Sequence, residues 1–350
     1  MNTQIRHITS FIHQWAPPGI KLDYDNVGLL VGDPSAEVKR ILVCLDVTEE
    51  VADEAIEKKC ELIVSHHPLI FKKISRINPT NEQGRILYKL IGHNIGLLSA
   101  HTNLDAALDG VSFVLANNLG LDNLEFLDKS YNISEKITLT TDAEDTESVL
   151  KLLNYYSAEE AHYFEVDGRN EGLKCFEAVI DRHNIPQLKA ALNKEKLLKK
   201  GSLQIASLNE STNNFGMGVI GNYPENGIAK DEFLYLVCRA LDVPSIRYSG
   251  GPSVIKKVAV CGGAGISLKD KALSSGVDAF LTADIKYHDF FTEKNNFLLV
   301  DTGHYENEFP VVEAIRKELS EAFEAIEVES TKCVTNPVKY FVTDLEQKQL

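Results

Sequence analysis

The sequence lacks several features that would assign it to a common class of protein. Its six cysteines show no C-x-x-C spacing, which argues against a disulfide framework and a thiolate zinc site. No run reaches the roughly 18 apolar residues of a membrane span, and no G-x-S-x-G motif supports a serine-hydrolase triad. Positive charge is scarce, since 36 lysines and arginines face 51 aspartates and glutamates, a net charge of −15. That charge disfavours binding to nucleic acid or to an anionic membrane.

The amino-terminal stretch MNTQIRHITSFIHQW contains no continuous apolar segment of the kind found in secretory signals. We therefore expect a cytoplasmic protein that binds neither nucleic acid nor membrane. The chain of 350 residues is long enough for two or three domains with a substantial core.

Two stretches of the chain follow the same pattern of strand, helix, strand, helix, strand. In the first, VKRILVC (38–44) leads through an amphipathic segment to ELIVSHH (61–67) and then to IGLLSAHTNLD (95–105). In the second, IKKVAVC (255–261) leads to DAFLTAD (278–284) and then to FLLVDTGHYENE (297–308). Such alternation is typical of a mostly parallel sheet covered by helices. The fold class predicted is α/β, with two related halves forming one layered domain, residues 1–127 and 213–350.

A different pattern separates the two halves. From about residue 128 to 212 the expected order is β-α-β-β-α-β, with strands at KITLTT, HYFEVDG, CFEAVIDRH and SLQIASL. This order is that of the ferredoxin-like motif. We therefore expect residues 128–212 to form an inserted α+β domain.

Histidines and carboxylates gather where the predicted strands end. One strand ends at His66 and His67, and another at His101 with Asp105 four residues later. A third ends at His304 with Glu308 four residues later. Asp46 and Asp284 also follow strands. Ligands of parallel α/β sheets bind at the carboxyl ends of strands, and buried imidazoles and carboxylates without partners are costly unless a cation accompanies them.

The spacing of these residues indicates two metal ions rather than one. Adjacent residues of an extended strand point to opposite sides, so His66 and His67 are expected to serve different ions. Asp105 or Glu308 could bridge the pair. With His304, these residues leave positions open for water, the arrangement of a catalytic site, and paired ions can generate hydroxide at neutral pH. The nitrogen and oxygen donors suit zinc, iron, manganese or cobalt.

His101 has three possible roles that the sequence leaves open: a sixth ligand, a hydrogen-bond donor beside the ligands, or a proton carrier. We favour a catalytic role beside the metals. The glycines of VAVCGGAGIS could contact a phosphate or simply form a tight turn before a helix. GMGVIG (216–221) matches G-x-G-x-x-G but follows no apolar strand, so a turn into a strand is expected there.

Several segments resemble the signatures of the NGG-interacting-factor-three-like family, also called GTP cyclohydrolase I type 2 homologues. These segments are DNVGLLVG (25–32), SHHPLIF, AHTNLD, CGGAG and GHYENE. The resemblance implies a dinuclear metal centre held by His66, His67, Asp105, His304 and Glu308. It also implies a toroidal homohexamer and, in the long form of the family, an inserted domain similar to the PII/CutA group. Members often carry Gly-Glu where this chain has Ala283-Asp284, which keeps a carboxylate.

Our hypothesis is a metal-dependent hydrolase that acts on a small molecule, with a nucleotide among the candidates, and that holds the two divalent ions per chain that the resemblance implies. The family name suggests GTP as substrate, hydrated at the purine C8 and opened to formate and dihydroneopterin triphosphate. The alternative is a metal-binding regulatory or scaffold protein without turnover, in which the insert would bind an effector or gate the cavity.

Overall fold

The computed structural model describes residues 2–129, 134–141, 146–157, 160–165, 173–198, 201–208, 215–292 and 296–341. The chain forms two compact units, Met1–Asp128 with Met217–Leu350 and, inserted between these segments, Lys129–Gly216. Both contain helices and sheets, and the fold is mixed α/β, as the alternation of strands and helices predicts. Among the described helices, none is long and apolar enough to cross a membrane.

The first sheet of the larger unit has the strand order β1-β4-β3-β2-β17. Its strands are β1 (Gly28–Val31), β2 (Arg40–Cys44), β3 (Leu62–Ser65), β4 (Gly96–Ser99) and β17 (Glu327–Ser330). Strands β2, β3 and β4 run parallel, in a register that aligns Leu42 with Ile63 and Ile63 with Leu97. Strand β17 joins β2 in parallel, and β1 closes the other edge antiparallel to β4. The three strands predicted in the first half therefore form the parallel centre of this sheet.

The second sheet has the order β12-β16-β15-β14-β10-β5. Its strands are β5 (Asp122–Asp128), β10 (Met217–Asn222), β12 (Arg247–Gly250), β14 (Lys257–Val260), β15 (Ala279–Thr282) and β16 (Leu298–Asp301). Strands β14, β15 and β16 are parallel, and the other three pair antiparallel. A small ribbon of β11 (Ile228–Ala229) and β13 (Val254–Ile255) lies outside it. The GMGVIG stretch lies largely in β10, as expected.

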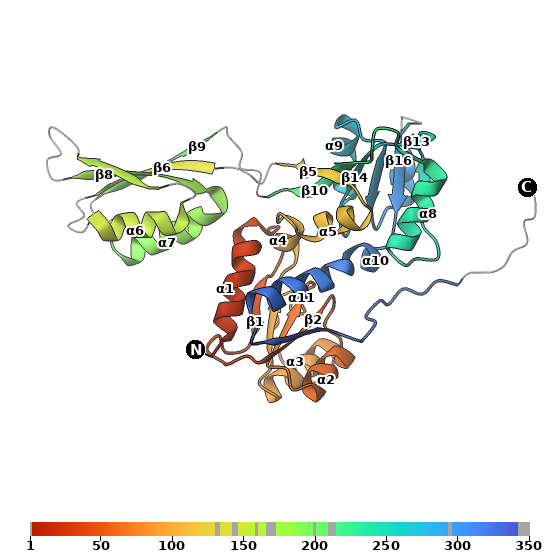
Figure 1. Ribbon diagram of the computed structural model, residues 1–350. Helices are drawn as coiled ribbons and strands as arrows, with labels where there is room; N and C mark the ends of the chain where they lie inside the picture. Colours follow the sequence, from red (N-terminus) through yellow and green to blue (C-terminus); the bar gives the residue numbers. More distant parts are fainter. Residues whose placement is uncertain are drawn as a thin grey trace, which may run out of the picture. The chain divides into compact units, whose positions relative to one another are not determined.

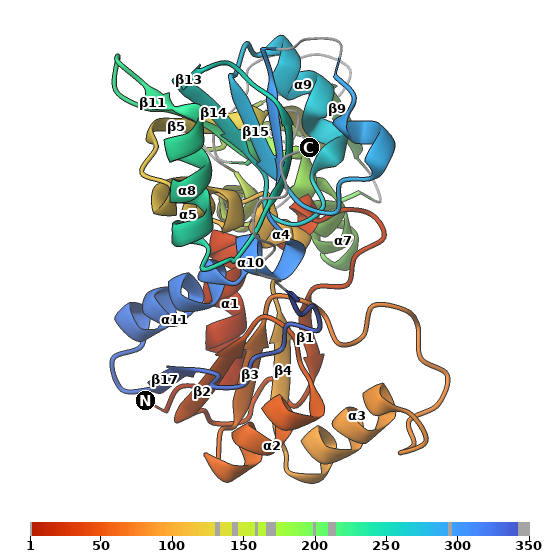
Figure 2. The same ribbon diagram turned by 90° about the vertical axis from the view of Figure 1, so that its right-hand side faces the viewer.

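Helices cover both faces of the first sheet (Figures 1 and 2). One face packs on α1 (Ile5–Trp15) and α11 (Pro310–Ala322), whose buried stripes include Ile8 and Ile315. The other face packs on α2 (Glu49–Glu57) and α3 (Glu82–Gly92). Their start points follow from capping, since Thr48 and Asn81 each accept a hydrogen bond from the first turn of the helix that follows. The apolar runs of β2, β3 and β4 are buried because helices lie on both sides.

The second sheet is covered in the same way. Helices α5 (Val111–Asn118) and α8 (Lys230–Ala240) pack on one face, and α9 (Lys269–Ser274) packs on the other. Between β15 and β16 the sequence predicts a helix, whereas the described residues form only the 3-10 turn η4 (Tyr287–Phe290). A shorter 3-10 turn, η3 (Ile266–Leu268), precedes α9. The second half is therefore a less regular version of the first.

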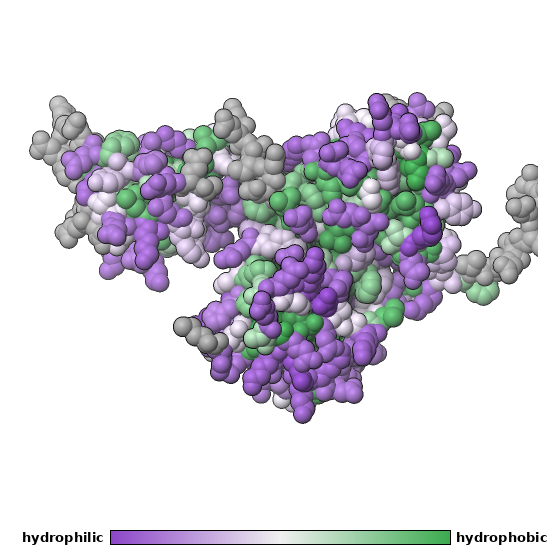
Figure 3. Space-filling model, in the orientation of Figure 1, coloured by the Kyte–Doolittle hydropathy of each residue, from purple (hydrophilic) through white to green (hydrophobic). Residues whose placement is uncertain are grey.

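The carboxy-terminal part of the larger unit returns to its first half. Helix α11 and strand β17 come late in the chain, yet they pack on and pair with β2. The larger unit thus interleaves its two halves rather than joining them by one linker. In Figure 3 most of the visible face of the first half is hydrophilic, as a surface rich in charge requires.

The inserted unit contains β6 (Ser134–Thr141), α6 (Thr146–Tyr156), β7 (His162–Glu165), β8 (Lys174–Asp181), α7 (Ile185–Lys194) and β9 (Ser202–Ser207). A 3-10 turn, η2 (Arg182–Asn184), leads into α7. The strands pair antiparallel in the order β7-β8-β6-β9, and Phe176, Leu153 and Leu188 are fully buried in its core. Its assignment to the ferredoxin-like class stays a prediction.

Candidate metal centre

The histidines and carboxylates singled out at strand ends in the sequence meet in one place, between the two sheets of the larger unit. His66 and His67 follow β3, while Asp105 lies on the short helix α4 (Thr102–Asp105) after β4. His304 and Glu308 begin and end α10 (His304–Glu308) after β16. Both views place α4 and α10 where the two sheets face each other (Figures 1 and 2). The strand ends of the two halves therefore converge, as the rule for parallel sheets predicts.

The histidine doublet lies in a bend rather than in the strand. Strand β3 ends at Ser65, whose hydroxyl donates to the carbonyl of His67 over 2.8 Å. The N–H groups of His66 and His67 donate to the carbonyls of Cys44 and Leu45 at the end of β2. The two rings consequently lie on the same side, with centroids 5.0 Å apart. The expectation that adjacent residues point to opposite sides is wrong here, because strand geometry ends one residue earlier.

Each of the four imidazoles is held by its Nδ1 atom. His66 Nδ1 lies 2.8 Å from the carbonyl oxygen of Ala100, and His67 Nδ1 lies 2.7 Å from Asp46 Oδ1. The same contact, at 2.8 Å, joins His101 to Asp25 and His304 to Asp284. Carbonyl and carboxylate oxygens only accept hydrogen bonds, so every ring carries a proton on Nδ1. In a neutral ring the Nε2 atom is then free to bind a metal, the arrangement found around most histidine ligands.

The ligand atoms form three overlapping groups, each within 4.8 Å. One group contains His66, Asp105 and Glu308, and a second contains His67, His304 and Glu308. The third contains His66, His67 and His101. In the second group Glu308 Oε2 lies 3.0 Å from His67 Nε2 and 3.1 Å from His304 Nε2. Glu308 is shared by two groups, so it suits the bridging position that the sequence left open between Asp105 and Glu308.

With each ring neutral and protonated on Nδ1, three buried atoms in these groups have no hydrogen-bond partner among the described residues: His66 Nε2, Asp105 Oδ1 and Glu308 Oε2. The nitrogens next to Glu308 Oε2 then carry lone pairs and cannot donate to it. His66 and Glu308 are almost fully buried, at 0% and 2% exposed. A buried polar atom without a partner costs roughly 1–3 kcal/mol, and charged groups cost more. The three atoms lie close together and have lone pairs, so a cation satisfies them at once. The residues present therefore fit a metal ion.

The electrostatics of the groups are dominated by Glu308. Burial acts to raise the pKa of Glu308, but the surrounding histidines outweigh it and hold this pKa well below its usual range. Glu308 in turn raises the pKa of His304 to about 9. Burial and the charge of Glu308 raise the pKa of Asp105 well above its usual range. The histidines and carboxylates of these groups therefore hold protons between them, and a metal ion that binds there displaces those protons.

Two carboxylates beside the rings have roles that the sequence did not assign. Burial acts to raise the pKa of Asp25, but hydrogen bonds from His101 and Thr102 hold it far below its usual range. Asp46 receives His67 Nδ1 on one oxygen and the hydroxyl of Thr335 on the other. Their positions in the sequence did indicate a place near the site, because Asp25 belongs to the DNVGL segment and Asp46 ends a predicted strand. Nothing in the sequence signalled Thr335, which is distant in the chain.

The glycine-rich loop after β14 packs against the carboxylate side of the centre. The N–H of Gly262 donates to Ser112 and that of Gly263 donates to Asn307. The N–H of Gly265 donates to the hydroxyl of Thr282. A Cβ at Gly263, where φ is +61°, would lie 2.3 Å from Glu308 Oε1. These N–H groups are engaged within the protein, and the glycine lets the backbone approach Glu308.

Comparison with known proteins identifies relatives that match almost the whole chain. The family model described as Duf34/NIF3 (NGG1p interacting factor 3) matches residues 3–337. A Staphylococcus aureus protein named GTP cyclohydrolase 1 type 2 homolog is 31% identical, over 96% of this chain and 100% of that protein. A Staphylococcus epidermidis protein of the same name is 32% identical, over 91% of this chain and 94% of that protein.

Solved structures match along almost the whole chain. The crystal structure of Staphylococcus aureus protein SA1388 is similar with a TM-score of 0.76 and 30% identity, and covers 97% of this chain and 99% of its own. A Bacillus cereus protein related to NIF3 gives a TM-score of 0.75 and 27% identity, with the same coverage. The likeness therefore includes both halves and the inserted unit.

Proposed function

The chain belongs to the Duf34/NIF3 family, and from that premise we propose that it is a hydrolase that depends on two divalent metal ions. The observation that carries the proposal is the buried carboxylate of Glu308, which is shared by two groups of possible metal ligands. His66, Asp105 and one oxygen of Glu308 would hold one ion. His67, His304 and the other oxygen would hold the second. Bound ions of this kind lower the pKa of water and polarise the group under attack.

The residues around the centre have the tasks of orienting ligands and moving protons. Ala100, Asp46 and Asp284 fix three rings through Nδ1, which leaves Nε2 of His66, His67 and His304 available to hold the ions. His101 is held by Asp25 in the same way. Its Nε2 atom would accept or deliver a proton at the reacting group. This role corresponds to general acid–base catalysis, and it makes His101 the catalytic residue of the proposal.

GTP is the first substrate to test, because close relatives carry the name GTP cyclohydrolase 1 type 2 homolog. Hydration at C8 of the purine, followed by ring opening, would release formate. Zinc, iron, manganese and cobalt all suit the nitrogen and oxygen donors. A cytoplasmic homohexamer is part of the same proposal. Light scattering that gives the mass of one 38.9 kDa chain would contradict the hexamer.

The experiment compares wild-type protein with Glu308→Gln, after each has been loaded with one metal at a time. Formate release from GTP is measured together with the metal-to-chain ratio. Glu308→Gln should lower both, with turnover reduced by about 100-fold or more, because the bridging oxygens lose their charge. Glu313→Gln is the matched control, since Glu313 is on the next helix and pairs with the partly exposed Arg316.

The outcomes separate the enzyme from the alternative, a metal-binding regulatory or scaffold protein. If metal-loaded wild type releases no formate from GTP, the protein is not a GTP cyclohydrolase, although it could still hydrolyse another substrate. A protein that binds metal but hydrolyses none of a panel of nucleotides, cyclic amides and phosphate esters is a scaffold. An enzyme whose turnover survives Glu308→Gln contradicts the proposal altogether.

A further inference from the structure

A cavity of about 620 Å³ opens beside the proposed metal centre. Its wall includes the rings of His67 and His304, so a molecule inside it reaches the metal ligands directly. Other parts of the wall come from Ser245–Arg247 at the start of β12 and from Asn336, Pro337, Val338 and Tyr340 in the carboxy-terminal segment. The volume is that of a typical small-molecule site.

Four carboxylates face this cavity, and three of them have a partner that can carry positive charge. Asp46 accepts from His67, and Asp284 accepts from His304. Asp301 forms an ion pair with Arg247. Among the described residues that line the cavity, Arg247 is the only lysine or arginine, and its charge is already paired with Asp301. The fourth carboxylate is Glu306.

Glu306 is held only by neutral groups. Its Oε1 atom accepts from the Asn336 amide over 2.9 Å and from the Tyr340 hydroxyl over 3.2 Å. No lysine, arginine or histidine in the described ranges forms an ion pair with it. Its Oε2 atom lies over Gly303, where a Cβ would come within 2.2 Å. Glu306 therefore presents a carboxylate held in place by two neutral donors. Both of these donors bind Oε1, so Oε2 can still accept hydrogen bonds from a ligand.

We propose that the cavity binds the nitrogen-rich end of the substrate, with Glu306 as the residue that accepts its N–H groups. This inference rests on the proposed function, because it identifies the cavity as the substrate pocket of that centre. The substrate class is a molecule that bears N–H donors, either a cation such as an ammonium or amidinium or a neutral amino-heterocycle. A hydrogen bond to a charged acceptor is stronger than one between neutral groups, so Glu306 selects such a donor.

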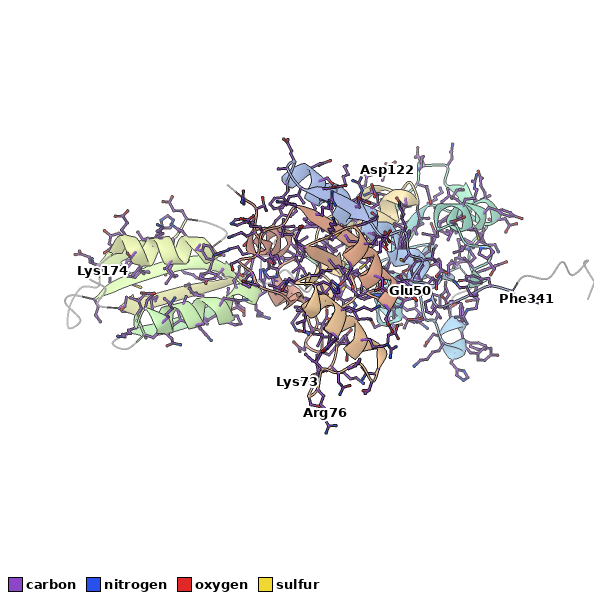
Figure 4. The ribbon with its side chains drawn as sticks, turned by 90° about the horizontal axis from the view of Figure 1, so that it is seen from below. Glu50, Lys73, Arg76, Asp122, Lys174 and Phe341 are labelled. Atoms are coloured by element: carbon purple, nitrogen blue, oxygen red, sulfur yellow. The ribbon has the colours of Figure 1, made fainter. Side chains whose placement is uncertain are left out.

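The end of the wall formed by Glu306 disfavours an anionic group. Lys73 and Arg76, on the loop after the histidine doublet, project away from the body of the larger unit (Figure 4) and do not line the cavity. A carboxylate or phosphate placed at Glu306 would meet like charge there, whereas the proposed ions beside His67 and His304 would attract it to the other end of the cavity. Lys339 donates to the Asn336 carbonyl and lines the neighbouring pocket rather than this cavity. A nucleotide would therefore enter with its base, rather than its phosphates, toward Glu306.

The test measures binding to the metal-loaded full chain by titration calorimetry, without turnover. One set of probes compares benzamidine, benzamide and benzoate, which match in size and differ in charge. A second set compares guanosine with inosine, which lacks the 2-amino group. Wild type should bind benzamidine at least about tenfold more tightly than benzoate, or guanosine more tightly than inosine by a similar factor. Glu306→Gln should remove the preference and keep the metal-to-chain ratio, whereas Glu313→Gln should change neither.

A Glu306-dependent preference in the first set identifies a cationic substrate, and one in the second set identifies an amino-heterocycle. The inference is overturned if neither set shows a preference, if benzoate binds best, or if the preference survives Glu306→Gln. Its failure can be told from failure of the proposed function. Formate release with an unchanged KM in Glu306→Gln removes the inference alone, and selective binding without turnover on any substrate removes the hydrolase alone.

Discussion

Gly263→Ala tests how closely the glycine-rich loop and the bridging carboxylate depend on each other. A methyl group at this position would lie 2.3 Å from Glu308 Oε1 and 3.5 Å from His304 Cε1. Because protein interiors are close-packed, the oxygen would have to retreat by about 0.7 Å to reach even the 3.0 Å limit of real contacts. That movement displaces Glu308 from both groups of donors. We expect metal affinity to fall by about 10–100-fold, the range seen when a supporting contact of a metal ligand is lost.

The backbone cost must be separated from the clash. Gly263 has φ +61°, and alanine in this region costs about 1–2 kcal/mol. Gly276 has φ +68°, and a Cβ there would meet no heavy atom of the described chain within 4 Å. Gly276→Ala is therefore the matched control, with the same backbone cost and no clash. Both variants should lower the Tm by a few degrees, about 2–4 °C per kcal/mol in a domain of this size.

The assay is elemental analysis after equilibrium dialysis at several metal concentrations, with thermal unfolding measured in parallel. Only Gly263→Ala should lose metal. Equal metal binding by the two variants, at equal loss of stability, would refute the claim that the loop's close approach positions Glu308.

Three further predictions follow from the contacts around the centre. Asp46→Asn should weaken metal binding by about tenfold, since His67 loses its charged acceptor, whereas Asp53→Asn, which breaks only the exposed pair with Lys89, should have no effect. Asp25→Asn should lower kcat by about tenfold or more while metal content stays unchanged, because Asp25 holds His101; a loss of metal instead would make His101 a ligand. Glu54→Gln should destabilise the protein at pH 7 by about 1–2 kcal/mol, after allowance for solvent screening. Burial acts to raise the pKa of Glu54, but hydrogen bonds from Thr331, Lys58 and the backbone of Lys332 outweigh it and lower the pKa to about 2. Because this value is below 4.5, the stabilisation is complete above about pH 4.5 and is lost as the pH falls toward 2, so the variant and wild type should converge in acid.

The sequence predicted the parallel centre of each sheet because buried parallel strands appear as continuous apolar runs. The runs ending at Ser65 and Asp301 are examples, and the residues after them converge as expected. The return of α11 and β17 to the first half was not predicted. Glu327 pairs with Arg40 across the sheet, and pairing between residues so far apart leaves no local pattern in the sequence.

The candidate site likewise combines features that the sequence predicted with features that depend on tertiary packing. The residues that meet at the centre were found from their chemical type and their position at strand ends. The direction of the doublet was not, because it depends on a bend fixed by Ser65 and by carbonyls of β2. The contact from Thr335 to Asp46 joins the carboxy-terminal segment to the first half and depends on tertiary packing alone.

Crystals of metal-loaded protein, with anomalous scattering recorded at the absorption edge of the bound metal, test the central claim most directly. The account predicts two peaks per chain. One should lie within coordination distance of His66 Nε2, Asp105 and Glu308, and the other within coordination distance of His67 Nε2, His304 Nε2 and Glu308. A single peak, or peaks that do not share Glu308, would contradict the paired centre.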